Sequence, residues 1–303
     1  MSGAPLRLGT RRSALALAQS GMVARAVAEA TGRPVDLVEI STYGDVSREA
    51  LAQIGGTGVF VSALRDALLD GRIDLAVHSL KDLPTKAPEG LVLAAVPERE
   101  DARDVLVARD GLKFADLPPG ARVGTGSPRR AAQLRLQRGD LEVVAIRGNV
   151  DTRIGYVATG DLDAVVLAYA GMSRLGRITE ATDYFDPACL VPAPGQGALA
   201  VECRDGEPDL AAGLAGLDHA HTRAAVLAER ALLAALEAGC SAPVGGYATV
   251  ADNALHLTGI VADTAGPRSI RMSTTGPLDQ AERLGQDLAA ELLDRGAAGF
   301  MGK

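Results

Sequence analysis

The chain has 303 residues, of which 47% are hydrophobic and 23% are charged, and its formal net charge is −7. This length suits two or three domains of ordinary size, each with its own apolar core. The acidic balance and the low aromatic content of 3% argue against a nucleic-acid binder, so no nucleic-acid partner is expected.

The three cysteines, Cys189, Cys203 and Cys240, are widely spaced and form no CxxC pair. An odd number with this spacing argues against a disulfide framework and against a structural zinc site, so we expect no metal. The N-terminus lacks the apolar segment of a secretory signal, and no apolar run reaches the length of a membrane span. We therefore expect a cytoplasmic protein without membrane contact.

Residues 6–10 (LRLGT) predict a strand, followed by Arg11-Arg12-Ser13 and a helix that ends near Gly32. A strand over 35–42 and a helix from near Val59 enclose a loop, 43–58, with four glycines. A loop of this length is typical of an active-site lid, although a disordered surface loop would look the same.

The next strand, 73–79 (IDLAVHS), is apolar enough to be buried on both faces and ends at Lys81 and Asp82. Ligands of open α/β sheets bind beyond the carboxyl ends of strands, so these two residues are candidates for a binding site. Lysine is rare in this chain, which makes Lys81 more informative than another arginine. We interpret His78 as a core residue.

A second helix start lies in residues 122–130, RVGTGSPRR. Ser127 is a preferred N-cap and Pro128 suits the first helical position. Arg129 and Arg130 then fall in the first turn, where the helix dipole repels cations, so the arrangement predicts a bound anion. Arg147 and Arg153 repeat the pattern one strand later. The alternative is that all four arginines are ordinary solvated side chains.

Two patterns recur in the same order along the chain. Residues 8–13 resemble 123–129, and residues 71–77 resemble 160–166. The repetition suggests two similar α/β domains, although convergence on a common α/β pattern would also explain it. Crossings near 98–102 and 191–197 look like the paired hinges of a two-lobed protein whose chain returns to its first lobe.

After residue 218 the sequence predicts a helix to Gly239, strands in 248–262 and 268–276, and a helix over 278–295. Cys240 follows the first helix in a loop rich in Pro and Gly. A helix C-terminus disfavours a thiolate, so Cys240 is either a core residue or a thiol that attacks once and stays attached. Cys189 and Cys203 lie in apolar stretches and are interpreted as packing residues.

These segments contain motifs that resemble the porphobilinogen deaminase (hydroxymethylbilane synthase) family from end to end. The motifs are TRRSALAL (10–17), TYGD (42–45), GGTGVF (55–60), AVHSLKDLP (76–84), ERED (98–101), GTGSPRR (124–130), RGNVDTR (147–153), AGMSRLG (170–176), PAPGQGAL (192–199) and GCSAPVGGYA (239–248). Ten motifs in the family's order make the resemblance specific.

The resemblance implies an α/β fold of three domains: two periplasmic-binding-protein-like lobes joined by paired hinges, and a small C-terminal α+β domain. The expected boundaries are 1–97 with 198–216, 102–191, and 218–303. The implied activity is that of a transferase in porphyrin and heme biosynthesis. It condenses four porphobilinogen molecules head to tail with loss of ammonia and releases linear hydroxymethylbilane. No apolar surface stripe is evident, so we expect a monomer.

The resemblance also implies a dipyrromethane cofactor, joined by a thioether to Cys240, and a catalytic carboxylate, Asp82. The residues that match the cofactor-binding set are Ser79, Lys81, Asp82, Thr125, Ser127, Arg129 and Arg130. Those that match the substrate-binding set are Arg11, Ser13, Arg147, Arg153, Arg174 and Gln196.

The implied chemistry agrees with these residue types. Each pyrrole carries two carboxylates, which arginine forks bind bidentately, and a fixed carboxylate can stabilise the cation left by ammonia and relay the ring proton.

The chain departs from the family at Tyr43, Thr57 and Ser62, where basic residues are common, and this should weaken substrate capture. A two-lobed small-anion binding protein is the alternative, which fold alone cannot exclude. The missing signal segment and the third domain with Cys240 favour the enzyme.

Overall fold

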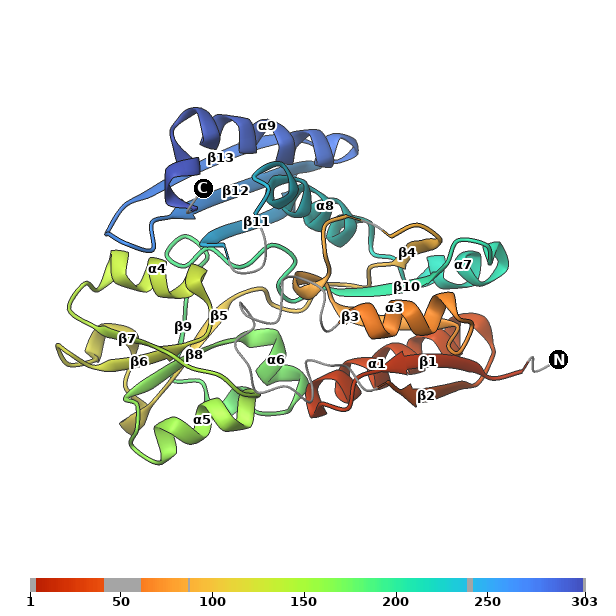
Figure 1. Cartoon of the computed structure of the whole chain (residues 1–303), viewed down its shortest axis with the longest axis horizontal. Coiled ribbons are helices and arrows are strands. Elements are labelled where there is room, and N and C mark those ends of the chain that lie inside the picture. Colours follow the sequence, from red (N-terminus) through yellow and green to blue (C-terminus); the bar gives the residue numbers. More distant parts are fainter. Residues whose placement is uncertain (1–3, 41–60, 87, 239–241, 302–303) are drawn as a thin grey trace. The chain divides into compact units, whose positions relative to one another are not determined.

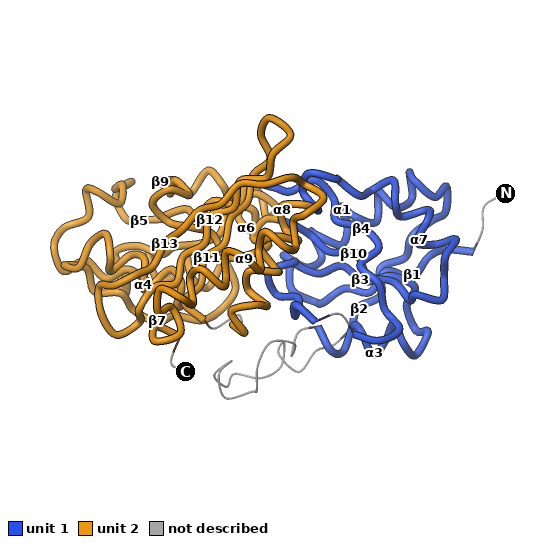
Figure 2. Tube along the Cα trace, turned by 90° about the horizontal axis from the view of Figure 1, so that it is seen from above, with its two compact units in different colours: residues 1–100, 198–223 blue, residues 101–197, 224–303 orange. Residues whose placement is uncertain are grey.

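The computed structural model describes residues 4–40, 61–86, 88–238 and 242–301 (Figure 1). The chain divides into two compact units, residues 1–100 with 198–223 and residues 101–197 with 224–303 (Figure 2). It therefore passes between unit 1 and unit 2 after Glu100, after Gly197 and after Arg223. Compactness groups the C-terminal segment with unit 2, and the three domain boundaries expected from the sequence stay predictions.

Unit 1 contains a sheet with the strand order β2-β1-β3-β10-β4. Strands β1, β2 and β3 are parallel, and β10 runs antiparallel to β3 and β4. Buried apolar side chains form one core on each face, so the strands are covered on both sides. The elements are β1 Leu6–Thr10, α1 Ala14–Thr31, β2 Val35–Glu39, α3 Ser62–Leu69, β3 Leu75–Ser79, η1 Leu80–Asp82, β4 Leu91–Ala95, β10 Leu199–Arg204, α7 Pro208–Leu214 and η5 Ala215–Leu217.

The lobe in the first part of unit 2 has the order β7-β6-β8-β5-β9 and repeats this topology. Strands β6, β7 and β8 are parallel, and β5 is antiparallel to β8. Two cores again cover the two faces. The elements are β5 Asp104–Ala108, η2 Arg109–Gly111, η3 Phe114–Asp116, β6 Arg122–Thr125, α4 Pro128–Gln137, β7 Glu142–Ala145, α5 Val150–Ala158, β8 Ala164–Ala168, α6 Tyr169–Arg174, η4 Ile178–Glu180 and β9 Asp183–Tyr184.

The two recurring sequence patterns make the same contacts in both lobes. A Cβ added at Gly9 would lie 2.3 Å from Ile73 Cδ1, and one added at Gly124 would lie 2.5 Å from Leu162 Cδ1. The residue after each of these apolar side chains is an aspartate that accepts a backbone hydrogen bond from the start of the parallel strand: Asp74 from Arg7, and Asp163 from Arg122. The prediction of two similar α/β lobes is confirmed.

The C-terminal segment, residues 220–301, forms the C-terminal layer: an antiparallel sheet, β11-β12-β13, covered by helices and containing its own apolar core. Asp252 and Asn253 both have positive φ, as the two-residue turn between β11 and β12 requires. The elements are α8 Ala220–Ala235, β11 Val244–Ala251, β12 Ala254–Ala262, β13 Ser269–Pro277, η6 Leu278–Gln280, α9 Ala281–Asp294 and η7 Ala297–Phe300. The predicted fold class, two α/β lobes and a small C-terminal α+β domain, is confirmed.

The helix ends predicted at Ser13, Gly32 and Ser127 are confirmed, whereas the helix predicted to reach Gly239 ends at Ala235. Ser13 caps α1, which ends at Gly32 with a φ of 66°, and Ser127 caps α4 with Pro128 at its first position. Asn149 caps α5 by accepting from the Thr152 backbone N–H. The loop 43–58 lies outside the described residues. No helix in the described ranges is long and apolar enough to cross a membrane.

One interpretation of the cysteines is wrong. Cys203 is fully buried in a core of unit 1, as expected, but Cys189 is exposed. Cys189 lies in a turn in which its backbone N–H bonds to the Asp186 carbonyl, and the next two residues, Leu190 and Val191, are the ones that enter the core. An apolar stretch of this length does not show which side chain a turn leaves outside.

We expect Gly9→Ala and Gly124→Ala each to destabilise the protein by about 1–3 kcal/mol, because a methyl group would overlap a buried side chain just before the adjacent strand. Urea unfolding of the full chain measures the effect. Gly21→Ala is the matched control: its nearest neighbour is the Arg25 guanidinium at 3.9 Å, and alanine favours its helix. An unchanged urea midpoint for Gly9→Ala and Gly124→Ala would contradict the close packing.

Candidate functional site

In unit 1 the predicted site residues lie at one edge of the sheet. Strands β1 and β3 are parallel neighbours, so their carboxyl ends meet at the same edge. Arg11 and Ser13 follow β1, and Ser13 caps α1. Ser79 ends β3, and Lys81 and Asp82 occupy the 3₁₀ turn η1 directly after it.

The turn that carries Asp82 is fixed by apolar side chains on both sides. Leu80 and Leu83 are buried, and the Leu80 backbone N–H donates to the Ala198 carbonyl at 3.0 Å. Asp82 itself is exposed. An exposed carboxylate on an anchored turn is suited to contact a ligand without large movements of its own backbone.

A buried polar group lies behind this edge. Glu202 of β10 receives a bidentate pair from Arg65 of α3, at 2.7 and 3.0 Å, and His78 Nε2 lies 3.1 Å from Glu202 Oε2. Burial raises the pKa of Glu202, but His78 and Arg65 outweigh burial and lower this pKa to about 2. His78 is buried, as expected for a core residue, and its neighbour is a carboxylate rather than only apolar side chains.

In unit 2 the predicted residues lie where β6, β7 and β8 end. Thr125 ends β6 and accepts a hydrogen bond from the Ser127 backbone, and the Ser127 hydroxyl accepts from the Arg130 backbone. Arg147 follows β7, and Arg153 of α5 donates through Nε to the Gly148 carbonyl. Because the three strands are adjacent and parallel, these groups share one edge of the sheet.

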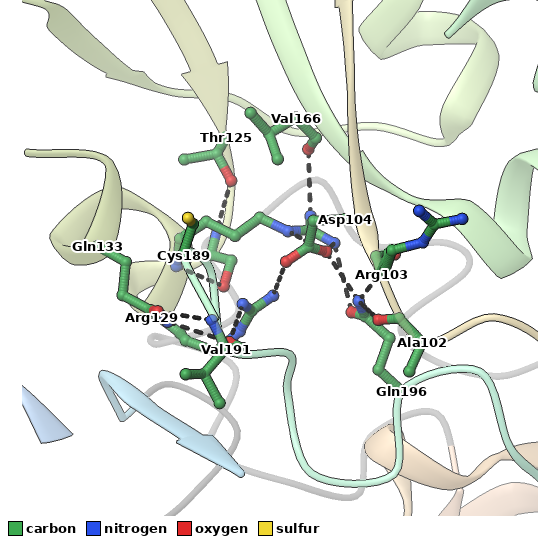
Figure 3. A network of polar contacts seen from close by, with 12 residues as sticks. Ala102, Arg103, Asp104, Thr125, Arg129, Gln133, Val166, Cys189, Val191 and Gln196 are labelled. Atoms are coloured by element: carbon green, nitrogen blue, oxygen red, sulfur yellow. Dashed lines mark hydrogen bonds and ion pairs between the residues drawn. The ribbon is translucent and has the colours of Figure 1, made fainter. Parts of the chain in front are cut away.

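Arg129 and Arg130 point into the protein, where both pair with Asp104; Figure 3 shows Asp104 and Arg129 in this network. Arg129 Nη2 is 2.8 Å from one Asp104 oxygen, and Arg130 donates to the other through Nε at 3.0 Å and Nη2 at 2.7 Å. Asp104 is fully buried, and the two arginines are 3% and 5% exposed. Burial raises the pKa of Asp104, and the two guanidinium charges lower it to about 2.

The anion predicted at the start of this helix is therefore, in part, an internal carboxylate. One carboxylate faces two guanidinium groups, so the three side chains together carry one excess positive charge. Burial lowers the pKa of Arg153, and the neighbouring charges of Arg130 and Arg147 lower it further. The cluster therefore keeps one positive charge that no described carboxylate of the cluster neutralises.

Gln196 and Arg174 complete this edge of unit 2. Gln196 is 1% exposed, and its amide N–H donates to the Asp104 carboxylate at 2.8 Å and to the Ala102 carbonyl at 2.7 Å. Arg174 of α6 donates through Nη2 to the Gly197 carbonyl at 2.6 Å. The segment 191–197 is thus a largely buried strip, whose Val191 carbonyl also accepts from Arg129.

Some expected residues cannot be placed in this way. Cys240, Tyr43 and Thr57 lie outside the described residues. Ser62 is the exposed first residue of α3. In the described ranges, no group of three or more His, Cys, Asp and Glu side chains is arranged to hold a metal ion.

The sequence interpretation missed three buried carboxylates: Asp104, Glu202 and Glu229. Each stands in an apolar stretch, DVLVA, LAVECR or VLAERALL, and a lone acidic residue there was a usable signal. Glu229 is fully buried in α8 and accepts from the backbone N–H groups of Gly195 and Ala248, so it joins the C-terminal layer to the segment 191–197.

Taken together, unit 1 presents an exposed carboxylate beside a lysine, and unit 2 presents a cationic edge with one buried counterion. Such a cationic edge suits ligands that carry several carboxylates. An exposed carboxylate can accept a proton or stabilise a cation.

Two family models together match most of this chain. One is described as "Porphobilinogen deaminase, dipyromethane cofactor binding domain" and matches residues 6–212, and the other is the C-terminal domain of the same family, matching 223–294. Porphobilinogen deaminase 1 of Streptomyces coelicolor is 63% identical over 316 residues, covering 100% of this chain and 99% of that protein. Porphobilinogen deaminase of Thermobifida fusca is 57% identical over 306 residues, covering 98% and 96%.

Among solved structures, a periplasmic substrate-binding protein of an ABC transporter from Coxiella burnetii matches 70% of this chain and 91% of its own, with a TM-score of 0.45 and 14% identity. A likeness this distant carries no argument about function.

Because the buried carboxylates have lowered pKa values, the free energy of unfolding falls at acidic pH. The folded-state pKa of Glu202 is about 2, and that of the unfolded chain is near 4.5, so the stabilisation is complete above pH 4.5 and is lost as the pH falls toward 2. We expect Glu202→Gln to lower the free energy of unfolding at pH 7 by about 3 kcal/mol and to flatten its decline between pH 4.5 and 2.5.

Urea unfolding at a series of pH values measures this profile. Asp70→Asn is the control, because Asp70 is exposed and 3.4 Å from Arg72, so its removal should change stability by less than about 0.5 kcal/mol. Equal stability of Glu202→Gln and the unaltered chain at pH 7 would contradict the assignment.

Proposed function

The chain belongs to the porphobilinogen deaminase family, and we propose that Asp82 and Cys240 are the residues on which its chemistry depends. It is an enzyme, a transferase of tetrapyrrole biosynthesis that polymerises pyrrole units, and residues 6–212 match the dipyrromethane cofactor-binding domain. The match over the full length of the chain carries this conclusion. We propose that the substrate is porphobilinogen and that four units leave as linear hydroxymethylbilane.

Each addition breaks one bond and forms another. The C–N bond of the incoming aminomethyl group breaks and ammonia leaves; the methylene carbon then bonds to the free α-carbon of the last ring, which loses its proton. When bound, the cofactor supplies the ring to which the first substrate is added. The chain's own residues have to hold carboxylates, stabilise a positive charge and take up a proton.

Asp82 is suited to the last two tasks. Its carboxylate is exposed on the turn that Leu80 and Leu83 anchor, so it is fixed before substrate arrives. A fixed carboxylate stabilises the cation that remains when ammonia leaves, and it can then accept the proton of the coupled ring. Lys81 lies next to it in the turn and supplies a cation for a carboxylate of the bound pyrroles.

The arginine residues of unit 2 are suited to hold the carboxylates. Arg129 and Arg130 share one excess positive charge, and the buried Arg129 Nε has no hydrogen-bond partner among the described residues. This donor set fits an anionic cofactor, because a further carboxylate would neutralise the excess charge. We assign Ser79, Lys81, Thr125, Ser127, Arg129 and Arg130 to the cofactor, and Arg11, Ser13, Arg147, Arg153, Arg174 and Gln196 to the substrate and growing chain.

We propose that the cofactor is joined to Cys240 through a thioether. The family resemblance in GCSAPVGGYA supports this assignment. Of the other cysteines, Cys203 is buried in a core, where burial raises the pKa of its thiol, and such a thiol is a poor nucleophile. The monomeric state and the cytoplasmic location expected from the sequence stay predictions.

Asp82→Asn should lower kcat by roughly 10²–10³-fold or more, because the substitution removes the charge that stabilises the transition state. The fold should be retained, since Asp82 is exposed and the leucines that anchor its turn are unchanged. Steady-state kinetics with porphobilinogen and the melting temperature provide the measurement. Glu89→Gln, an exposed carboxylate of the same unit, is the control and should keep its activity. Near-normal turnover in Asp82→Asn would remove Asp82 from this role.

Cys240→Ala should fold, carry no pyrrole adduct and be inactive, because the attachment atom is missing. Cys240→Ser should carry a reduced amount of adduct, since a hydroxyl attacks the reactive methylene less readily than a thiol. Intact mass, activity and melting temperature are measured together. Cys189→Ala and Cys203→Ala are the matched controls and should keep both adduct and activity. An adduct that survives in Cys240→Ala, or is lost in either control, would place the attachment elsewhere.

A further inference from the structure

Asp104 is a buried carboxylate for which the proposed chemistry has no direct use. It begins β5, opposite Ala168 at the end of β8, so it lies at the sheet edge that carries the arginines. It is fully buried, so neither substrate nor solvent reaches it. All described partners of its carboxylate are side chains of the site: Arg129, Arg130 and Gln196.

The geometry of this cluster fixes both guanidinium groups. Arg130 uses Nε and Nη2 on one Asp104 oxygen and Nη1 on the Val166 carbonyl at 3.1 Å. Arg129 uses Nη2 on the other oxygen and Nη1 on the Val191 carbonyl at 2.6 Å. Each arginine is thus held by Asp104 and by one backbone carbonyl, which leaves little freedom for its plane to rotate.

The cluster also holds a defined charge. Two guanidinium groups and one carboxylate leave one positive charge in a place where the side chains are at least nine-tenths buried. A buried charge of this kind is costly unless an anion neutralises it. Arg129 Nε, which has no hydrogen-bond partner among the described residues, is a donor that such an anion could use.

Gln196 connects the cluster to two of the three segments where the chain passes between units. It lies one residue before Gly197, and its amide N–H bonds to the carbonyl of Ala102, which follows the passage at Glu100. Its amide oxygen accepts from Arg130 Nη2 at 3.4 Å. The arginine pair is therefore linked, through the Gln196 side chain, to the passages after Glu100 and after Gly197.

We propose that Asp104 and Gln196 are positioning residues for the reaction: they hold Arg129 and Arg130 in one orientation with a single excess positive charge, so that a carboxylate of the bound pyrroles completes the cluster. The inference rests on the proposed function, because it takes Arg129 and Arg130 as residues that bind the cofactor. Neither Asp104 nor Gln196 touches the reacting atoms. Asp104 acts through the two arginines, and Gln196, which we assigned above to the substrate and growing chain, also orients Arg130.

The test uses the full chain as it is expressed, with Asp104→Glu as the main variant. Glutamate keeps the charge and the pairing but displaces the carboxylate by one methylene group. We expect a melting temperature within about 5 °C of the unaltered chain, a smaller fraction of molecules with the pyrrole adduct by intact mass, and a kcat per adduct-bearing molecule at least about tenfold lower. A purely structural role would leave kcat per adduct-bearing molecule unchanged.

Gln196→Met provides the second variant, because it keeps the volume and removes the amide without changing the charge. A positioning role lowers kcat per adduct-bearing molecule and leaves KM within about threefold, whereas direct contact with substrate raises KM at constant kcat. Asp183→Asn is the control: this carboxylate of the same unit accepts only backbone N–H groups in the described structure, and its removal should leave adduct and kcat unchanged.

The test separates failure of the proposed function from failure of the positioning role alone. If the unaltered chain carries no adduct and does not turn over porphobilinogen, the proposed function is wrong. If the unaltered chain is loaded and active, and Asp104→Glu and Gln196→Met match it in adduct fraction and in kcat per loaded molecule, only the positioning role is overturned.

Discussion

The interaction on which the second lobe depends is a single buried carboxylate shared by two arginines. Asp104 can stay ionised in the interior only because Arg129 and Arg130 face it, and the two arginines can be buried only because Asp104 is there. One charge remains after this pairing. The same contacts that stabilise the fold therefore also leave unit 2 with an excess positive charge beside the sheet edge to which we assign the cofactor.

The two lobes use one architecture for different electrostatic purposes. In each lobe the antiparallel strand carries a buried carboxylate, Glu202 in β10 and Asp104 in β5. Glu202 pairs with one arginine, Arg65, and lies beside His78, and the edge of its lobe presents the exposed Asp82. Asp104 is matched by two arginines, so its lobe stays cationic. The repeated contacts at Gly9 and Gly124 keep the sheets alike while these charged residues differ.

Local signals predicted much of this structure from the sequence. Ser127 with Pro128, Ser13 and Gly32 each act within their own helix end, so the helix ends could be located without the rest of the fold. The burial of Arg129 and Arg130 could not be predicted in this way, because their partner Asp104 is more than twenty residues away and belongs to another strand. The interpretation of Cys189 as a packing residue was wrong for a related reason: the direction of one side chain in a turn depends on the core beside it. The roles of Asp82 and Cys240 came from the family resemblance and not from local patterns.

The position of β10 also affects the order in which the chain can fold. This strand lies between β3 and β4 in the first sheet, yet it is synthesised roughly a hundred residues after β4. At ribosomal rates the delay is about 5–20 s. All strands of the second lobe, Asp104 to Tyr184, emerge within that interval and can complete their sheet. Until β10 is made, the edges of β3 and β4 in the first lobe stay unpaired. The part of the protein that is made first therefore completes its sheet after the lobe that follows it.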